Sequence, residues 1–298
     1  MTLQTSEFSS TQTRRIVSWL GLLPLPLITA CASVPLPQTG ALSSYKQLQA
    51  SDGLLTKARV SVDKRAILTA KTVQIVPTSF SAAARATKLS ETERNVAANA
   101  VDRSVCIGLS DRFQIVLPPQ RADLTVYVSI ASIVPTDKTA AAASKVLSIG
   151  TSVATSTGIV ETSVPIPSLR VPIGLGGLAL EAEAVDQAGN QKAALLWARG
   201  ANSFTGKTRV SPVGDAYELA SSFGEDFSEL LVTGASPFNT KLPSLPSRQR
   251  VASLLGGAPK ESACEAFGRV GVTNMLAGSI GFPPEWTDKG AQVAPRTP

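Results

Sequence analysis

The sequence predicts an α+β domain in which a mixed or antiparallel sheet carries two main helices. Several short segments alternate β-branched with polar residues, as strands do, and two longer segments repeat apolar residues at helical spacing. The first half runs strand, helix, strand, strand, an order that favours a helix covering one face of a sheet. With 298 residues, 43% of them hydrophobic, the chain is large enough to bury a core.

Four segments of the first half are predicted strands. They are KARVSV (57–62), TVQIV (72–76), FQIVL (113–117) and DLTVYVSIASIV (123–134). The second ends at a proline and the third at a pair of prolines. In the fourth, apolar residues alternate strictly with polar ones from Leu124 to Ile130, which is typical of a half-buried strand.

Two helices and a hairpin complete the predicted domain. The first helix begins at a capping box, Ser90 to Glu93, and carries an apolar stripe with a period of four residues. The hairpin, LALEAEAVDQAGNQKAALLWARG (178–200), has Gly189-Asn190 at its turn, with Glu181 and Glu183 on its exposed face. The second helix spans residues 215–231 and stops before Gly234.

Two regions show little periodicity. Residues 139–160 are rich in Ala, Ser, Thr and Gly and fit a small-residue helix, an insertion or a hairpin. Lys145 and the many hydroxyls exclude a membrane span there. Residues 236–298, rich in Pro, Gly and Ser, are predicted to form a loosely ordered C-terminal extension.

The N-terminus has the layout of an export signal. Arg14 and Arg15 precede an apolar run, Ile16 to Ala30, which is too short to span a bilayer. The run ends in Ile-Thr-Ala-Cys, which resembles the bacterial lipobox. That resemblance implies cleavage between Ala30 and Cys31 and acylation of Cys31, including a palmitate-type chain; the alternatives are an ordinary secretory signal or a buried core cysteine. Three acyl chains would hold the chain firmly to a membrane.

The resemblance also implies an address in the cell envelope. Because Ala32 follows Cys31, the expected site is the periplasmic face of the outer membrane, with the inner-membrane periplasmic leaflet as the alternative. The arginine pair resembles a twin-arginine signal only weakly, so ordinary Sec export is favoured. The predicted organisation is a signal peptide (1–30), a lipidated flexible tether (31–53), the α+β domain (54–235) and the extension (236–298).

The remaining cysteines are even in number. With Cys31 acylated, Cys106 and Cys264 are the other two, in an oxidising compartment. A disulfide between them is predicted, closing a loop of about 160 residues; two separate buried thiols are the alternative.

Catalytic and metal-binding chemistry finds little support. Histidine is absent, which removes imidazole bases, histidine-dependent nucleophiles and the commonest transition-metal ligand. RGANSFTGKT (199–208) has alanine where a phosphate-binding loop needs its first glycine, and GLGGLA (174–179) leads into a strand-like segment instead of a helix. SSYK (43–46) with SDG (51–53) is too crowded to be a serine transpeptidase site. We therefore assign no catalytic residue, metal ligand or cofactor.

The net charge is +6, and positive charges gather in the region after the signal. This region could lie against anionic head groups or peptidoglycan, or could be a solvated surface. Location excludes nucleic acid. The residues concerned are Lys46, Lys57, Arg59, Lys64, Arg65 and Lys71, opposed by Asp52 and Asp63.

The order of several segments resembles a known family. These are GALSSYKQLQ after the lipobox, TVQIVP, the capped helix, RADLTVYVSI, the LALEAEAVDQAGNQ hairpin and the ARG that follows. Together they resemble the family of predicted bacterial lipoproteins catalogued as domain of unknown function 3313, over roughly residues 39–233. The family has no assigned activity, so the resemblance implies no catalytic residues.

Two classes of function follow. The preferred hypothesis is a non-enzymatic periplasmic lipoprotein that binds an envelope protein or a cell-wall component. The alternative is a hydrolase of the cell envelope that uses carboxylates such as Glu181, Glu183 or Asp186, since a pair of acids can hydrolyse glycosides without histidine.

Overall fold

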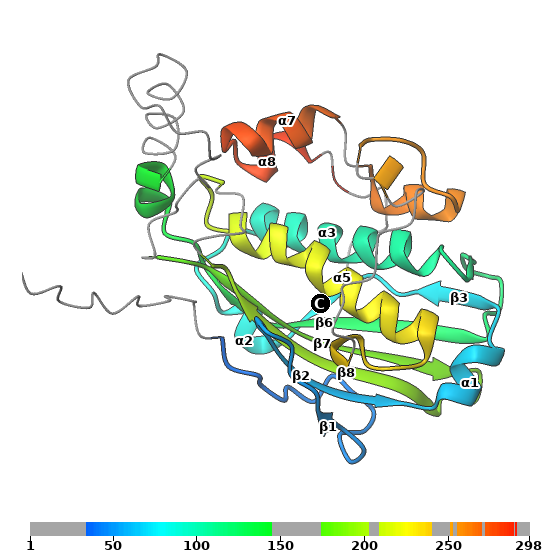
Figure 1. Ribbon diagram of the computed structural model, residues 1–298. Coiled ribbons are helices and arrows are strands. Elements are labelled where there is room, and N and C mark those ends of the chain that lie inside the picture. Colours follow the sequence, from blue (N-terminus) through cyan, green and yellow to red (C-terminus); the bar gives the residue numbers. More distant parts are fainter. Residues whose placement is uncertain are drawn as a thin grey trace, which may run out of the picture.

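One mixed sheet forms the base of the fold (Figure 1). The computed structural model describes residues 34–144, 174–202, 209–239, 251–252, 255–269, 272–288 and 290. Within these residues the sheet has eight strands in the order β1-β2-β8-β7-β6-β3-β5, with β4 also paired to β6. The strands are β1 (Gln49–Ala50), β2 (Thr56–Val62), β3 (Thr72–Ile75), β4 (Ser79–Phe80), β5 (Gln114–Ile115), β6 (Leu124–Val134), β7 (Gly177–Asp186) and β8 (Gln191–Gly200).

The sheet combines antiparallel and parallel pairs. Strands β2, β8, β7 and β6 pair antiparallel, whereas β3 runs parallel to both β5 and β6. The β7–β8 connection is the predicted hairpin, and Gly189 takes a positive φ of 79° at its turn. The predicted α+β class with a mixed sheet is confirmed.

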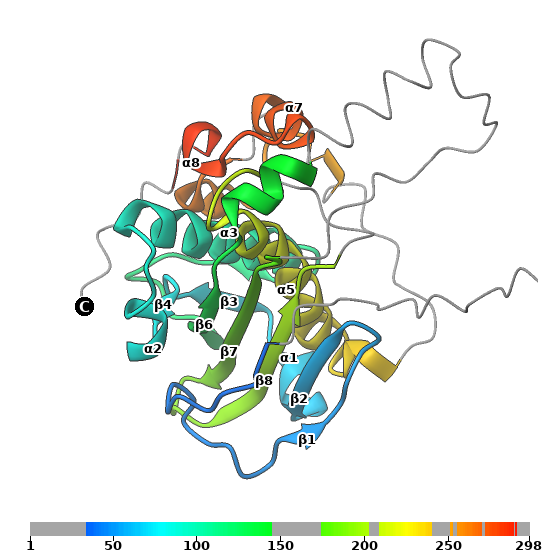
Figure 2. The same cartoon turned by 90° about the vertical axis from the view of Figure 1, so that its left-hand side faces the viewer.

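Two long helices cover one face of the sheet side by side (Figures 1 and 2). They are α3 (Glu91–Leu109), which begins with the predicted capping box, and α5 (Gly214–Thr233), which ends at Gly234 in a left-handed conformation. Both are the predicted helices. Their axes approach closely because glycines face serines: a Cβ on Gly224 would lie 2.3 Å from Ser104 Oγ. A Cβ on Gly108 would lie 2.2 Å from Ser228 Oγ.

The core lies between these helices and the sheet. The apolar stripe of α3 is fully buried, and Trp197 of β8 packs edge-on against Phe223 of α5 with ring centroids 5.7 Å apart. Phe223 in turn stacks on Phe227. The buried stripe consists of Ala97, Val101, Val105 and Leu109.

Shorter helices complete the described chain. They are α1 (Lys64–Thr69), α2 (Ala82–Arg85), η1 (Pro237–Asn239), η2 (Ser262–Phe267), α7 (Val272–Ile280) and α8 (Pro284–Thr287). Residues 138–144, at the start of the Ala/Ser-rich region, are also helical; residues 145–160 lie outside the described residues. Among the described helices, none is long and apolar enough to cross a membrane.

The C-terminal extension is more firmly attached than the sequence suggests. Its helices η2, α7 and α8 lie over the side of α3 that faces away from the sheet (Figures 1 and 2). Arg103 of α3 and Asp288 form a salt bridge of 2.6 Å whose side chains are 4% and 1% exposed. The hydroxyl of Tyr217 donates to the same carboxylate at 2.8 Å. The composition of the extension does not indicate these contacts, because they join single side chains that are far apart in the sequence.

Candidate functional site

The chain after the expected lipid site lies across the outer face of the sheet, opposite the helices. Glu181 of β7 holds it there. One carboxylate oxygen accepts the N–H of Thr39 at 2.6 Å, and the other accepts the N–H of Ala41 at 3.1 Å and the hydroxyl of Tyr45 at 2.6 Å. Burial, followed by the hydrogen bond to Glu181, raises the pKa of Tyr45.

Glu183 makes a second clamp two residues along the same strand. Its carboxylate accepts the N–H and the hydroxyl of Ser43 at 2.9 and 2.7 Å, and the amide of Gln191 at 2.7 Å. Glu181 and Glu183 are therefore only 1% and 6% exposed. The two glutamates share one face of the hairpin, as predicted. The prediction that this face is exposed is wrong, because the segment that begins at Val34 covers it.

This covering changes the predicted boundary of the tether. From Val34 onward, the segment assigned to the tether is part of the folded region, which therefore starts before residue 54. Val34 is 3% exposed and packs against Ala131, Ala179 and Ala198. Gly177 makes room for it, since a Cβ there would lie 2.2 Å from Val34 Cγ2. The predicted cleavage and lipidation residues, Ala30 and Cys31, lie outside the described residues.

The two other predicted site residues are brought together. Cys106 of α3 and Cys264 of η2 form a disulfide with a Cα–Cα distance of 5.6 Å, across a sequence separation of 158. This is the predicted pairing, and it attaches the C-terminal extension to the main domain. In the part of the chain that is described, no three His, Cys, Asp or Glu side chains group so that they could hold a metal ion.

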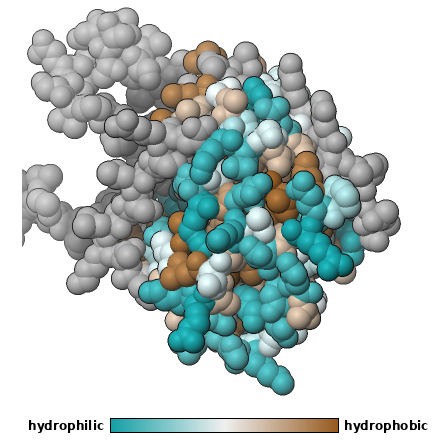
Figure 3. Space-filling model, turned by 90° about the vertical axis from the view of Figure 1, so that its right-hand side faces the viewer, coloured by the Kyte–Doolittle hydropathy of each residue, from teal (hydrophilic) through white to brown (hydrophobic). Residues whose placement is uncertain are grey.

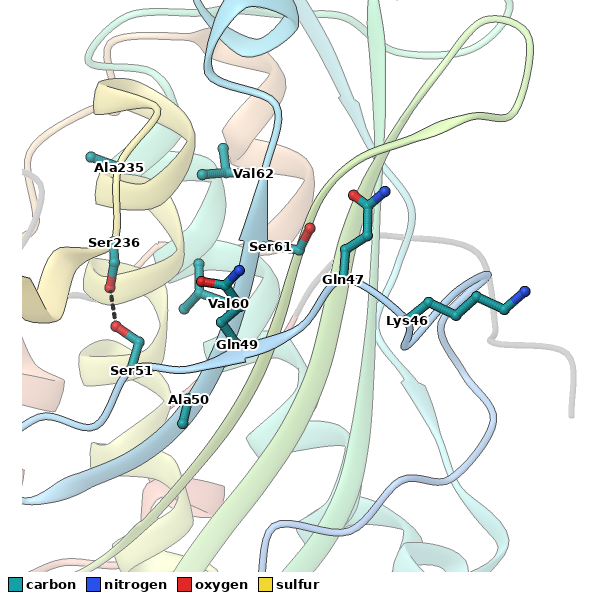
Figure 4. Close-up of a pocket in the computed structure, with 10 residues that line it drawn as sticks. All are labelled: Lys46, Gln47, Gln49, Ala50, Ser51, Val60, Ser61, Val62, Ala235 and Ser236. Carbon is teal, nitrogen blue, oxygen red and sulfur yellow. Dashed lines mark hydrogen bonds between the residues drawn. The ribbon is translucent and has the colours of Figure 1, made fainter.

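A groove of about 820 Å³ lies along the edge of β2, between β1 and the end of α5 (Figure 4). Its lining is polar, and the hydroxyls of Ser51 and Ser236 hydrogen-bond at 2.7 Å between the two sides. The lining residues are Lys46, Gln47, Gln49, Ala50, Ser51, Val60, Ser61, Val62, Ala235 and Ser236.

The backbone of β2 turns hydrogen-bonding groups toward this groove. Ala58 faces β1, because its N–H donates to the carboxylate of Asp52 at 2.8 Å and its carbonyl accepts the N–H of Ser51 at 3.0 Å. Asp63 faces β8, to which its N–H donates at 2.7 Å. Successive residues of a strand alternate sides, so Val62 directs its N–H and C=O to the β1 side.

The pairing between β1 and β2 does not reach Val62. It stops at Gln49, opposite Val60, because the residues that precede Gln49 turn away from β2 at Lys46 and Gln47. Figure 4 shows these two residues leaving the edge of β2. In the described residues no further strand pairs with this edge, so the groove exposes the edge of β2 at Val62. The sequence does not reveal this site, because an open edge depends on which strands pair.

Only one of the two nucleotide-like motifs is fully described. Gly177, within GLGGLA, begins strand β7, so no helix starts there and the predicted strand is confirmed. Residues 203–208 of the P-loop-like segment lie outside the described residues.

The family model described as protein of unknown function (DUF3313) matches residues 37–227. The chain belongs to this family. The match covers residues 37–48 of the segment on the outer face, the whole sheet and most of α5, but not the C-terminal extension. No curated protein matches the chain.

Two solved structures of the PelC dodecamer from Paraburkholderia phytofirmans are similar to this chain. The first, a point variant, is 12% identical, covers 57% of this chain and 95% of its own, and has a TM-score of 0.31. The second is 11% identical, covers 60% of this chain and 98% of its own, and has a TM-score of 0.34. A likeness of this size carries no inference about function.

Proposed function

We propose that this DUF3313 protein is a membrane-anchored periplasmic lipoprotein, not an enzyme, that binds an extended segment of an envelope protein. The observation that carries the proposal is the open edge of β2, with the N–H and C=O of Val62 turned into a polar groove. A peptide laid along such an edge adds a strand to the sheet, and its own backbone supplies the matching groups.

The choice of a polypeptide over a cell-wall component rests on the pairing of donor and acceptor at Val62. Its N–H and C=O lie on the same side of β2, and one residue of an extended polypeptide carries both the matching acceptor and the matching donor. Around them stand amide and hydroxyl side chains, including Gln47, Gln49 and Ser61, which can bind a partner's side chains. The nearby cation Lys46 favours an acidic residue in the bound segment.

Membrane attachment is supported by the sequence around Cys31 and by the chain that follows it. From Val34 onward this chain is fixed on the sheet, by the burial of Val34 and by hydrogen bonds to Glu181 and Glu183. An acylated Cys31 would therefore hold the domain close to the membrane and in a restricted range of orientations. The disulfide suits an oxidising compartment. We assign the periplasmic face of the outer membrane, since Ala32 is not the aspartate typical of inner-membrane retention.

The contacts of the three acids favour binding over the alternative hydrolase. Glu181 and Glu183 are covered by the N-terminal segment and accept hydrogen bonds from it. Asp186 is held in the hairpin turn, where hydrogen bonds from Asn190 lower its pKa to about 2. Hydrolysis would need one of these acids to act as a proton donor near neutral pH.

Site-specific photocrosslinking in intact cells tests the proposal. A photoreactive residue at Gln47, in the groove, should capture one envelope protein through a defined segment, and one at Glu91, at the exposed start of α3, should not. A synthetic peptide of the captured segment should then bind the purified protein. Capture of the same proteins from both positions would contradict a groove-specific partner.

A pair of variants then tests the edge itself. Val62→Pro removes the N–H directed at the groove, whereas Val62→Ala keeps it and only trims the side chain. Binding of the peptide should fall about tenfold or more in the proline variant and stay near the wild-type value in the alanine variant. Thermal unfolding of both variants controls for folding. Equal peptide binding by two folded variants would exclude recognition through the edge.

A further inference from the structure

Two leucines stand exposed in the turn between β1 and β2. Leu54 is 100% exposed and Leu55 is 38% exposed. The turn is firmly held, because Gly53 donates its N–H to the carbonyl of Thr56 at 2.9 Å. The carboxylate of Asp52 likewise accepts a backbone N–H from β2. The leucines are therefore displayed on a fixed turn, although burial of their apolar surface would be favourable.

The chain enters the fold beside this turn. Val34, the first described residue, lines a shallow hollow of about 370 Å³ together with Leu54, Leu55 and Lys57. Its slot over Gly177 fixes its position on the sheet. The dark blue start of the described chain in Figure 1 accordingly lies at the end of the sheet opposite α1.

Covalent geometry then limits how far this end can be from the membrane. Three peptide units separate Cys31 from Val34, and an extended chain spans at most about 3.6 Å for each, or about 11 Å in all. With Cys31 acylated in the bilayer, the hollow at Val34 stays within that distance of the lipid head groups.

We infer that Leu54 and Leu55 insert into the lipid surface beside the anchor, so that this end of the sheet faces the bilayer. This rests on the lipid anchor of the proposed function. Exposed Lys57, in the same hollow, adds electrostatic attraction to anionic head groups. Anchor, leucines and cation thus hold one orientation of the domain.

The opposite end of β2 provides a matched control. Leu68 on α1 is also exposed, at 47%, but α1 follows the last residue of β2, a strand of seven residues. At about 3.3 Å per residue, the strand carries Leu68 some 20 Å farther from the anchor. That end of the molecule shows hydrophilic side chains interspersed with small hydrophobic patches (Figure 3).

Fluorophore accessibility in vesicles tests this orientation. The full mature protein, carrying Leu54→Cys or Leu68→Cys labelled with a polarity-sensitive dye, is reconstituted by its acyl chains into phosphatidylethanolamine–phosphatidylglycerol vesicles. The dye at position 54 should be shielded severalfold from an aqueous quencher and shifted to the blue, while the dye at position 68 stays accessible. Equal accessibility at both positions would overturn the inference.

Two further readouts separate this inference from the anchor itself. Intact mass reports acylation, and flotation with vesicles reports membrane attachment. If the protein is acylated and floats but the dye at position 54 is accessible to the quencher, only the contact of the leucines with lipid is contradicted. Protein that carries no acyl chain contradicts the proposed anchoring instead. Shielding at position 54 that appears without vesicles and grows with protein concentration would assign the leucines to a second copy, against the lipid surface.

Discussion

Asp226 should make the stability of the folded protein depend on pH. It lies on α5 over β8, where its carboxylate accepts the indole N–H of Trp197 at 2.7 Å. Burial raises the pKa of Asp226 from 3.8 to about 6, against the lowering effects of the Trp197 hydrogen bond and the charge of Arg199. The ionised form is therefore disfavoured in the folded protein.

The sign and size of the effect follow by linkage. Between pH 3.8 and about 6 the folded protein binds more protons at Asp226 than the unfolded chain does, so stability falls as pH rises through this window. A difference of about two pKa units corresponds to about 3 kcal/mol at pH 7.5. Asp226→Asn keeps an oxygen acceptor for Trp197 and removes the charge, so it should stabilise the protein by about 2–3 kcal/mol at pH 7.5.

Urea unfolding of both proteins from pH 3 to pH 8 measures this directly. The difference in free energy of unfolding should be near zero at pH 3 and should grow until about pH 6. Asp123 and Asp186 do not interfere, because their pKa values are lowered and both are shared by the two proteins. A difference that does not vary with pH, or a less stable Asp226→Asn at pH 7.5, would refute the reasoning.

Three further predictions concern the attachments of the chain ends. Replacing Cys106 and Cys264 by Ala opens a closed loop and should lower the free energy of unfolding by about 5 kcal/mol in non-reducing urea titrations. Adding reductant should lower the stability of the wild type and leave that of the variant unchanged. Asp288→Ala leaves the Arg103 guanidinium buried without its carboxylate and should cost about 3–5 kcal/mol by thermal or urea unfolding; an unchanged stability would contradict a buried pair. Glu181→Ala removes the acceptor of three hydrogen bonds and should cost about 2–4 kcal/mol, with cleavage near residues 34–48 in limited proteolysis, whereas wild-type resistance there would show that the clamp is not needed.

The elements of the domain could be predicted because their signals are local. The capping box at Ser90, the four-residue stripe of α3, the glycine after α5 and the turn at Gly189 each depend on a few neighbouring residues. The disulfide could be predicted because the count of cysteines left few choices. These features do not depend on how distant segments pair.

The features that failed or were missed depend on distant segments. Glu181 and Glu183 alternate as surface residues should, and nothing near them in the sequence shows that residues 39–45 will cover them. One signal was present: Leu42, Tyr45 and Leu48 recur every three residues and pack together against β8. The open edge of β2 and the salt bridge of Arg103 have no comparable signal, because each joins parts of the chain far apart in sequence.

The central claim is that the chain is anchored through Cys31, and acylation of that residue is the measurement that tests it most directly. Intact mass of protein purified from membranes, with metabolic labelling by a palmitate analogue, should give a mature chain that begins at Cys31 and carries acyl groups. Cys31→Ser lacks the acceptor sulfur, so it should remain a longer, unlabelled precursor. Label that persists in Cys31→Ser, or a mature N-terminus at another residue, would contradict the account.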